Sequence, residues 1–355
     1  MPDLQAKRPD EPAFSVPHGS LRAVIGFGVR LFDRRSHPEQ WVDFDQRPEA
    51  LGGRLRGGNI RPFDALYWDD SAQPKAAQTD VMIQITAETE LAVNRFIVEI
   101  TKLIEDESLG VTMTTFVSGF HRDDRRSWID FHDGVNNMAA PDRAVAMEVS
   151  NLDSPWMVGG TFVAFLKIAV NLSEWRKLSR TQQEVIVGRT KLTGCPLLDT
   201  QHNQDSLSYR TIDGCPTTGN LQPPLPAEFR DPPRPVDDLV RASHIHRSNQ
   251  NRGAADQDSS NRIYRQGYEF LDPADGGVTA GLNFIGFQRD MISVRNILNI
   301  HSWMGGVNFG GPEETTGTVP PVQLMTLLAG GFFAVPPAST PYPGAELFTS
   351  QLLVA

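Results

Sequence analysis

Two short stretches carry the side chains whose types and spacing could do chemistry. The first, IDFHDGVNNM at residues 129–138, places Asp133 directly before a glycine and beside two asparagines, among neighbours that favour burial. The second, RASHIHRSNQNRG at residues 241–253, carries His244 and His246 two positions apart. Carboxylates and imidazoles are groups that proteins use to transfer protons and to bind metal ions.

The residues alone leave three interpretations of the histidine pair open. On a β-strand, a spacing of two places both imidazoles on one face, where they could bind a bare metal ion. One of them could instead be the ligand of a haem iron, with the other directed at a propionate or at solvent. Both could also be ordinary surface residues of a polar loop.

The patterns of several common catalytic sites are absent from the sequence. It contains no GxSxG nucleophile elbow and no GxxxxGK[ST] phosphate loop, and GFGVRL lacks the third glycine of a dinucleotide-binding turn. Neither HExxH nor CxxC, which would indicate a metal site, occurs.

Hydrophobic periodicity indicates the elements that must position these side chains. In TDVMIQITAETELAVNRFIVEITKLI, apolar residues alternate at Val81, Ile83 and Ile85 and then recur at helical spacing from Val93 to Ile104. This change of period predicts a strand that runs into an amphipathic helix. The earlier segment LRAVIGFGVRLF is typical of a strand whose glycines allow another backbone to approach closely.

The strand-to-helix switch occurs twice more along the chain. GGTFVAFLKIAVNLSEW predicts a strand and a helix that extends into TQQEVIVGR, where Thr181 and Glu184 have the spacing of a capping box. AGLNFIGFQRDMISVRNILNI repeats the pattern. These units favour two α+β halves, each an antiparallel sheet with helices packed on it.

The predicted domain organisation follows from these units. We expect a flexible arm over residues 1–20, an N-terminal half with the Asp133 loop over 21–145, and a C-terminal half over 146–355. Segments rich in Pro, Gly, Asp and Asn predict long loops near 199–235 and 305–321.

Composition limits the classes of partner. The net charge of −10 argues against nucleic acid and anionic membranes, because either would require a clustered basic surface. The longest apolar run, FVAFLKIAV, is too short to span a bilayer. No secretory signal is recognisable, and the two cysteines, Cys195 and Cys215, favour ordinary reduced thiols, so we predict a cytoplasmic protein.

Across nearly all of its length the chain resembles the dye-decolorizing peroxidases, a family of haem enzymes. The resemblance implies two ferredoxin-like halves of the dimeric α+β barrel type, with haem b (iron protoporphyrin IX) in the C-terminal half. Nine pieces occur in the order expected of the family: AVIGFGVRLF, DVMIQITAETELAVNRF, DFHDGVNN, GGTFVAFLKIAVNLSEW, GRTKLTGCPL, SHIHRSN, IYRQGYEF, GLNFIGFQRD and GGFFAVPPA.

The resemblance assigns three principal roles. Asp133 matches the distal aspartate of the GxxDG element, which would accept a proton of hydrogen peroxide and return it as the O–O bond breaks. Arg265, before QGY, matches the distal arginine, which would stabilise the negative charge that develops. His244 matches the histidine that ligates iron. A carboxylate acid–base stays ionised further into acid than a histidine, so we expect an acidic turnover optimum.

Four further residues would contact the cofactor. Gly134 and Asn137 belong to the same element as Asp133, and Asn249 and Arg252 fall where the family commonly approaches a haem propionate. The roles of a carboxylate that orients His244 and of a surface electron relay stay open. The candidates are Asp290, Glu313 and Glu314 for the carboxylate, and Trp128, Trp156, Trp175, Trp303 and Tyr264 for the relay, each of these aromatic residues also suiting the core.

The match departs from the family pattern at several positions. Asp130 occupies the first glycine of GxxDG, so it would strain or redirect the turn if that position needs a positive φ. Its carboxylate would raise the pKa of Asp133 if the two side chains converged, whereas a solvent-facing Asp130 would not. Met138 and Gln250 replace prolines, and His246 replaces a common arginine.

The leading hypothesis is a haem peroxidase that uses hydrogen peroxide to oxidise dyes, phenols or other aromatic donors in one-electron steps. One alternative is a haem-binding or haem-handling protein with weak turnover. The other is a non-haem α+β module that uses its histidines for a metal or for interaction. Association into a homo-oligomer is left open.

Overall fold

The structure is a computed structural model that describes residues 19–32, 79–150, 155–203, 206–218, 225–234, 236–248, 262–291, 293–294, 297, 322–338 and 343–347. The strands in this part of the chain are β1 (Arg22–Gly28), β2 (Val81–Thr86), β3 (Thr161–Val170), β4 (Leu197–Asn203), β5 (Ser206–Thr211), β6 (Tyr264–Ala274), β7 (Gly277–Gln288) and β8 (Met325–Val335). The helices are α2 (Glu90–Asp106), α3 (Ala140–Met147), α4 (Leu172–Trp175), α5 (Arg180–Val187), α6 (Asp238–Arg241) and α7 (His244–Arg247).

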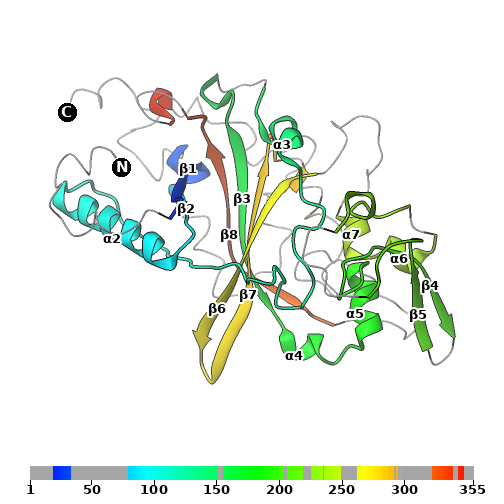
Figure 1. The fold of residues 1–355 in the computed structure, drawn as a ribbon. Coiled ribbons are helices and arrows are strands. Elements are labelled where there is room, and N and C mark those ends of the chain that lie inside the picture. The colour runs from blue at the N-terminus through cyan, green and yellow to red at the C-terminus, as the bar shows by residue number, and fades with distance from the viewer. Residues whose placement is uncertain are drawn as a thin grey trace.

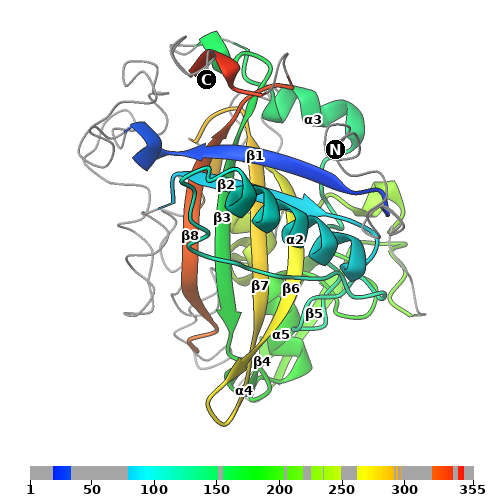
Figure 2. The ribbon, with the colours of Figure 1, turned by 90° about the vertical axis from the view of Figure 1, so that its left-hand side faces the viewer.

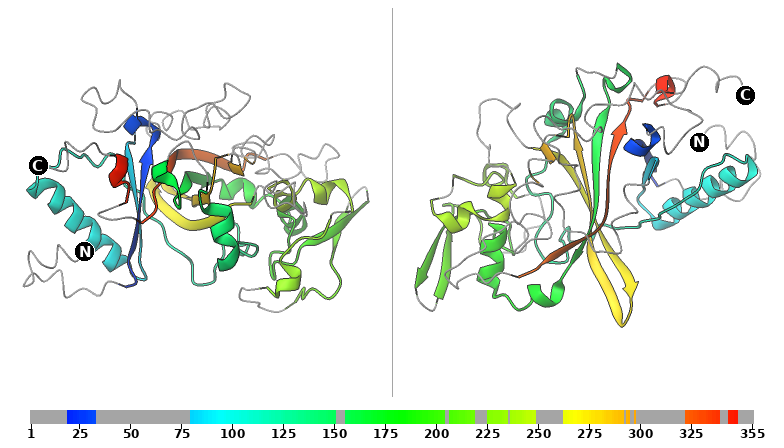
Figure 3. Two further views of the ribbon diagram at one scale, coloured as in Figure 1. Left: turned by 90° about the horizontal axis from the view of Figure 1, so that it is seen from above. Right: turned by 180° about the vertical axis from the view of Figure 1, so that it is seen from behind.

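Six strands form one antiparallel sheet in the order β2-β1-β8-β3-β7-β6, and β4 pairs with β5 in a separate hairpin. Figure 1 shows α2 on one side of this sheet, and α5, α6, α7 and the hairpin on the other. The view from above in Figure 3 shows the same separation. The predicted α+β class with antiparallel strands is confirmed.

The central strands bury side chains on both faces of the sheet. Because side chains of a strand alternate between faces, β3 contributes to two separate hydrophobic clusters. Phe162, Ala164, Leu166 and Ile168 pack with Leu327 of β8. On the opposite face, Val163 packs with Ile285, Phe287 and Val335.

Strands β1 and β2 join the rest of the sheet through a narrow seam. β1 pairs with β2 over six positions, but with β8 only at Phe27–Ala334 and Gly28–Phe333. Figure 2 shows β1 and β2 running across the direction of the other strands. At Gly28 a Cβ atom would lie 2.3 Å from the Thr79 carbonyl oxygen, so the predicted close approach of another backbone is confirmed.

The predicted switch from β2 to α2 is found complete. The strand of the second switch is β3, but its helix is divided: α4 ends at Trp175, and a separate helix, α5, begins at Arg180 with Ser179 as its N-cap, so the predicted continuation of one helix into TQQEVIVGR is wrong. After β7, Ser293, Val294 and Ile297 are helical, and the remainder of that switch lies outside the described residues. No helix in the described ranges is long and apolar enough to cross a membrane.

The N-terminus of α5 differs from the prediction. Ser179 is the N-cap, and its side chain and that of Gln182 form a reciprocal capping box, two residues before the predicted pair. Glu184 cannot serve as the capping glutamate because its buried carboxylate accepts bonds from the Lys191 N–H and the Tyr209 hydroxyl.

The predicted loop near 199–235 begins with regular structure, because β4 and β5 pair from Leu197–Thr211 to Asn203–Ser206. The loop near 305–321 lies outside the described residues, as does the arm except for its last two positions.

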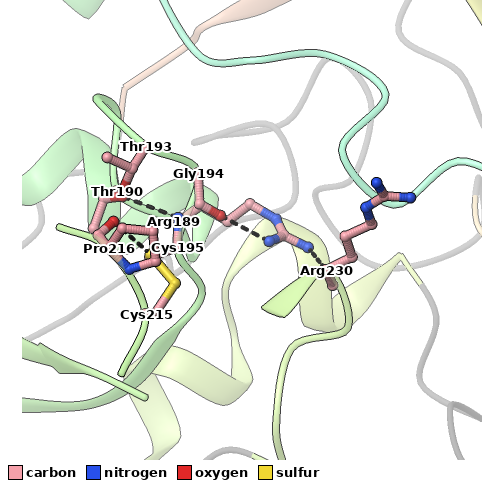
Figure 4. Close-up of a disulfide and its surroundings, with 8 residues drawn as sticks. All are labelled: Arg189, Thr190, Thr193, Gly194, Cys195, Cys215, Pro216 and Arg230. Carbon is pink, nitrogen blue, oxygen red and sulfur yellow. Dashed lines mark hydrogen bonds between the residues drawn. A yellow bond between two sulfur atoms is a disulfide. The ribbon is translucent and has the colours of Figure 1, made fainter. Parts of the chain in front are cut away.

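The prediction of two reduced cysteines is wrong. Cys195 and Cys215 form a disulfide with Cα atoms 6.1 Å apart (Figure 4). The reason is the β4–β5 hairpin, which returns the chain so that the segment after β5 lies beside the segment before β4. Both cysteines are buried and pack with Leu225.

Candidate active site

A cavity of about 260 Å³ lies on one face of the large sheet, just below the roughly 300 to 1,000 Å³ of typical ligand pockets. Alternate residues of four strands form its floor: Arg265 and Glu269 from β6, Leu282 and Phe284 from β7, Leu166, Ile168 and Val170 from β3, and Met325 from β8. The facing wall includes residues 127–129 and 131–136, Val187, Arg189, Gly194, His244 and Ile245. The floor is apolar except at β6.

Strand β6 supplies the polar side chains of the floor. Arg265, Gly267 and Glu269 occupy alternate positions and therefore share one face. A Cβ atom on Gly267 would lie 2.7 Å from Asp133 Oδ2, so the carboxylate of Asp133 lies directly over the glycine. The absence of a side chain at 267 gives that carboxylate its place between Arg265 and Glu269.

The loop that carries Asp133 is a tight turn. Asp130 N donates to the Ser127 carbonyl oxygen at 2.8 Å, and Ser127 N donates to that of Phe131 at 2.9 Å. Asp130 has φ of +67°, a left-handed conformation that favours glycine. The strained alternative predicted for Asp130 is therefore confirmed.

The side chain of Asp130 does not converge with that of Asp133. Its carboxylate is 58 % exposed and lies 3.8 Å from an Arg122 nitrogen and 3.9 Å from Lys191 Nζ. It is not among the residues that line the cavity, whereas Asp133 is. The orientation predicted as solvent-facing is the one observed.

Arg126 fixes this loop to the neighbouring wall. Its guanidinium donates to the carbonyl oxygens of Asp130 and Lys191, both at 2.6 Å, and to that of Leu192 at 2.8 Å. One of its nitrogens also lies 2.8 Å from His132 Nε2. These contacts hold the loop in place and so help to position Asp133, the residue after His132, above the sheet.

Asn137 fixes the backbone of Arg265. Its amide nitrogen donates to the Arg265 carbonyl oxygen at 2.6 Å, and its Oδ1 accepts from the Arg265 N–H at 3.1 Å. Asn137 is absent from the described lining of the cavity. These contacts position Arg265, and the cofactor contact of Asn137 stays a prediction.

His244 reaches the cavity from a helix. It is the first residue of α7, with Ser243 as the N-cap, so the strand considered for the two histidines is not formed. Residues two apart on a helix do not face each other. Only His244 of the pair lines the cavity, and no group of three His, Cys, Asp or Glu that could hold a metal lies together within the described ranges.

One cavity therefore has Asp133, Gly134, Arg265 and His244 in its lining, although 132 sequence positions separate Asp133 from Arg265. Asn249, Arg252, Glu313, Glu314 and Trp303 lie outside the described residues. Of the other relay candidates, Trp128 lines the cavity and donates its indole N–H to the Phe270 carbonyl oxygen at 3.0 Å. Trp156 and Trp175 are buried.

The sequence prediction missed Glu269. This side chain is 6 % exposed and lines the cavity. It accepts a hydrogen bond from the backbone N–H of Trp128 at 3.2 Å. Burial, helped by the negative charge of Asp133, raises the pKa of Glu269 to about 7, against the lowering effects of the Trp128 N–H and Arg122. Its spacing in the sequence could have indicated this role, because Glu269 stands four residues after Arg265 and therefore on the same face of β6.

Comparison with known proteins gives consistent results. The family model "Dyp-type peroxidase, C-terminal" matches residues 124–340, which is more than half of the chain. A dye-decolorizing peroxidase of Mycolicibacterium paratuberculosis is 33% identical over 188 residues, covering 52% of this chain and 47% of that protein. A deferrochelatase of Escherichia coli K12 is 24% identical over 330 residues, covering 89% and 66%.

Solved structures agree in fold. A DyP-type peroxidase from Cellulomonas bogoriensis has a TM-score of 0.62 at 20% identity, with 93% of this chain and 79% of that chain covered. At this identity the likeness concerns the fold alone. The chain spans about half the length of the first dye-decolorizing peroxidases it matches, 52%, 47% and 49% of each.

Proposed function

The chain belongs to the Dyp-type peroxidase family, and from this premise we propose that it is a haem peroxidase. It would use hydrogen peroxide to oxidise dyes, phenols or other aromatic donors in one-electron steps. The observation that carries the proposal is the meeting of Asp133, Arg265 and His244 around one largely apolar cavity.

The described cavity fits a haem group in its chemistry. The apolar floor from β3 and β7 suits the faces of a porphyrin, and His244 offers an imidazole for iron. Arg189 and Arg262 also line the cavity, and guanidinium groups suit the carboxylates of such a cofactor. When bound, haem supplies the iron and the redox chemistry, and His244 would hold it.

Asp133 would move the proton. Its Oδ1 accepts a hydrogen bond from the Gly134 N–H at 2.7 Å, which orients the carboxylate, and its Oδ2 is directed to the floor of the cavity over Gly267. A carboxylate held in this way can take a proton from one oxygen of peroxide and deliver it to the other.

Arg265 would supply a permanent positive charge beside that carboxylate. It is half-buried, and its backbone is held at both polar atoms by Asn137. In a cavity with apolar walls, a fixed cation stabilises developing negative charge more strongly than it would in water. It would therefore bind peroxide and favour cleavage of the O–O bond.

The experiment is to load the purified protein with haem, record its absorption spectrum and measure peroxide-dependent oxidation of a dye. Asp133→Asn should lower kcat/KM for peroxide by about 10²- to 10⁴-fold, the usual contribution of a general acid–base, and retain haem. Asp130→Asn is the matched control, because that carboxylate lies outside the cavity. His244→Ala should lose the haem spectrum, and His246→Ala should keep it.

A second candidate function is supported by the relatives named deferrochelatase. Such a protein would bind the same cofactor and release iron from it with little oxidation of donors. Iron-free porphyrin as the product, together with no peroxide-dependent dye oxidation, would favour this function over the peroxidase. The cytoplasmic location and the oligomeric state stay predictions, which fractionation of cells and sedimentation would test.

A further inference from the structure

We infer that Glu269 is a second acid of the cavity, a positioning residue that controls the charge beside Asp133 and Arg265 and so sets the alkaline limit of peroxide cleavage. The inference rests on the proposed peroxidase function. It concerns a carboxyl group that the three predicted roles do not use.

The placement of Glu269 comes from the strand. Arg265, Gly267 and Glu269 share one face of β6, at a rise of about 3.4 Å per residue in antiparallel strands. The Asp133 carboxylate lies over the middle position. Two carboxyl groups and one guanidinium therefore line the same short stretch of the cavity floor.

The surroundings of Glu269 favour its neutral form. Leu282 stands opposite it on β7, and the Glu269 side chain is almost fully buried. The charged groups that act on it are Asp133 and Asp124, which oppose ionisation, and Arg122, which favours it; the Trp128 N–H is its hydrogen-bond donor. Arg265 is the other charged group on the same strand face.

The charge of the cavity consequently depends on Glu269. While it is protonated, the charged side chains on this stretch of the floor are the carboxylate of Asp133 and the guanidinium of Arg265. Once it ionises, a second negative charge enters this stretch of the cavity floor and offsets the field of Arg265. This change weakens the binding of peroxide and the stabilisation of the breaking O–O bond.

The sign of the pH dependence follows. The folded protein favours the protonated form of Glu269, with a pKa of about 7 against 4.5 for an ordinary glutamate. The associated stability is complete below the ordinary value and is lost as the pH rises through about 7. The rate of peroxide cleavage should likewise fall as the pH rises through about 7.

The test uses the full-length protein and Glu269→Gln, which keeps an oxygen for the Trp128 N–H but cannot ionise. In the haem-loaded protein, the alkaline limb of kcat/KM for peroxide should move upward by about one pH unit or more in this variant. Glu105→Gln on the exposed surface of α2 is the matched control and should keep the wild-type profile. Asp133→Asn should lower the rate without moving the limb upward.

A second measurement does not depend on enzymatic activity. In ligand-free protein, the unfolding free energy of the wild type should decrease from pH 4.5 to 7.5 relative to that of Glu269→Gln, with Glu105→Gln parallel to the wild type. Parallel curves for wild type and Glu269→Gln, or an unmoved alkaline limb, would overturn the inference. A loaded protein without peroxide turnover would refute the proposed function and, with it, the effect of Glu269 on peroxide cleavage. The ligand-free measurement would still report whether Glu269 is a second buried acid.

Discussion

Removal of the Cys195–Cys215 disulfide should lower the stability of the protein by an amount that follows from its position in the chain. The two residues are 20 positions apart, so the bond closes a short loop in the unfolded chain. The loop-entropy relation gives about 3 kcal/mol for a loop of this length at 25 °C. The natural perturbation is the double variant Cys195→Ala/Cys215→Ala, because a single variant would leave a free thiol.

The measurement is equilibrium unfolding in urea, followed by fluorescence in the same buffer for both proteins. We expect the midpoint to fall by the equivalent of about 3 kcal/mol and the denaturant dependence to rise slightly, since the unfolded chain is no longer cross-linked. Reductant should destabilise the wild type by a similar amount and leave the double variant unchanged. The reductant series therefore provides the internal control.

Two results would refute this reasoning. One is a double variant that matches the wild type within about 0.5 kcal/mol, the usual range of neutral substitutions. The other is two titratable thiols in the unfolded, non-reduced protein, which would mean that the bond is not formed. The second result would restore the interpretation of both residues as reduced cysteines.

Three further substitutions test the geometry of the cavity. Asn137→Ala removes both hydrogen bonds to the Arg265 backbone and should lower the unfolding free energy by about 1–3 kcal/mol. The rate of peroxide cleavage should fall while haem remains bound, which kinetics and absorption spectra would show. Asp130→Gly should raise the urea midpoint by the equivalent of about 0.5–1 kcal/mol, since glycine accepts the +67° φ; no gain would indicate that the ion contacts of Asp130 offset its strain. Gly267→Ala should displace the Asp133 carboxylate and reduce kcat/KM for peroxide, and an unchanged value would contradict the placement of Asp133 over β6.

The parts of the fold that local pattern determines could be predicted from the sequence. The change from alternation at Val81, Ile83 and Ile85 to helical spacing correctly marked β2 and α2. The capping box of α5 was misplaced because Ser179–Gln182 and Thr181–Glu184 have the same spacing. Only the tertiary contacts of Glu184 with Lys191 and Tyr209 distinguish them.

The candidate site depended on long-range structure and was less accessible to local reasoning. Periodicity could not bring Asp133, His244 and Arg265 together, since their proximity is made by the order of strands; the family resemblance selected them. The same limit hid Glu269, whose burial is created by β7 and the loop at Trp128. The disulfide was missed because cysteine counting contains no information about the β4–β5 hairpin.

The narrow seam between β1 and β8 has a consequence for how the molecule opens. With two register pairs against ten between β3 and β8, the paired strands β1 and β2 should detach at a lower free energy than the strands beneath the cavity. Amide protons of β2 should then exchange with solvent well before those of β3 and β7. Loosening of this end of the molecule would leave Arg265, Glu269 and the floor around them in place.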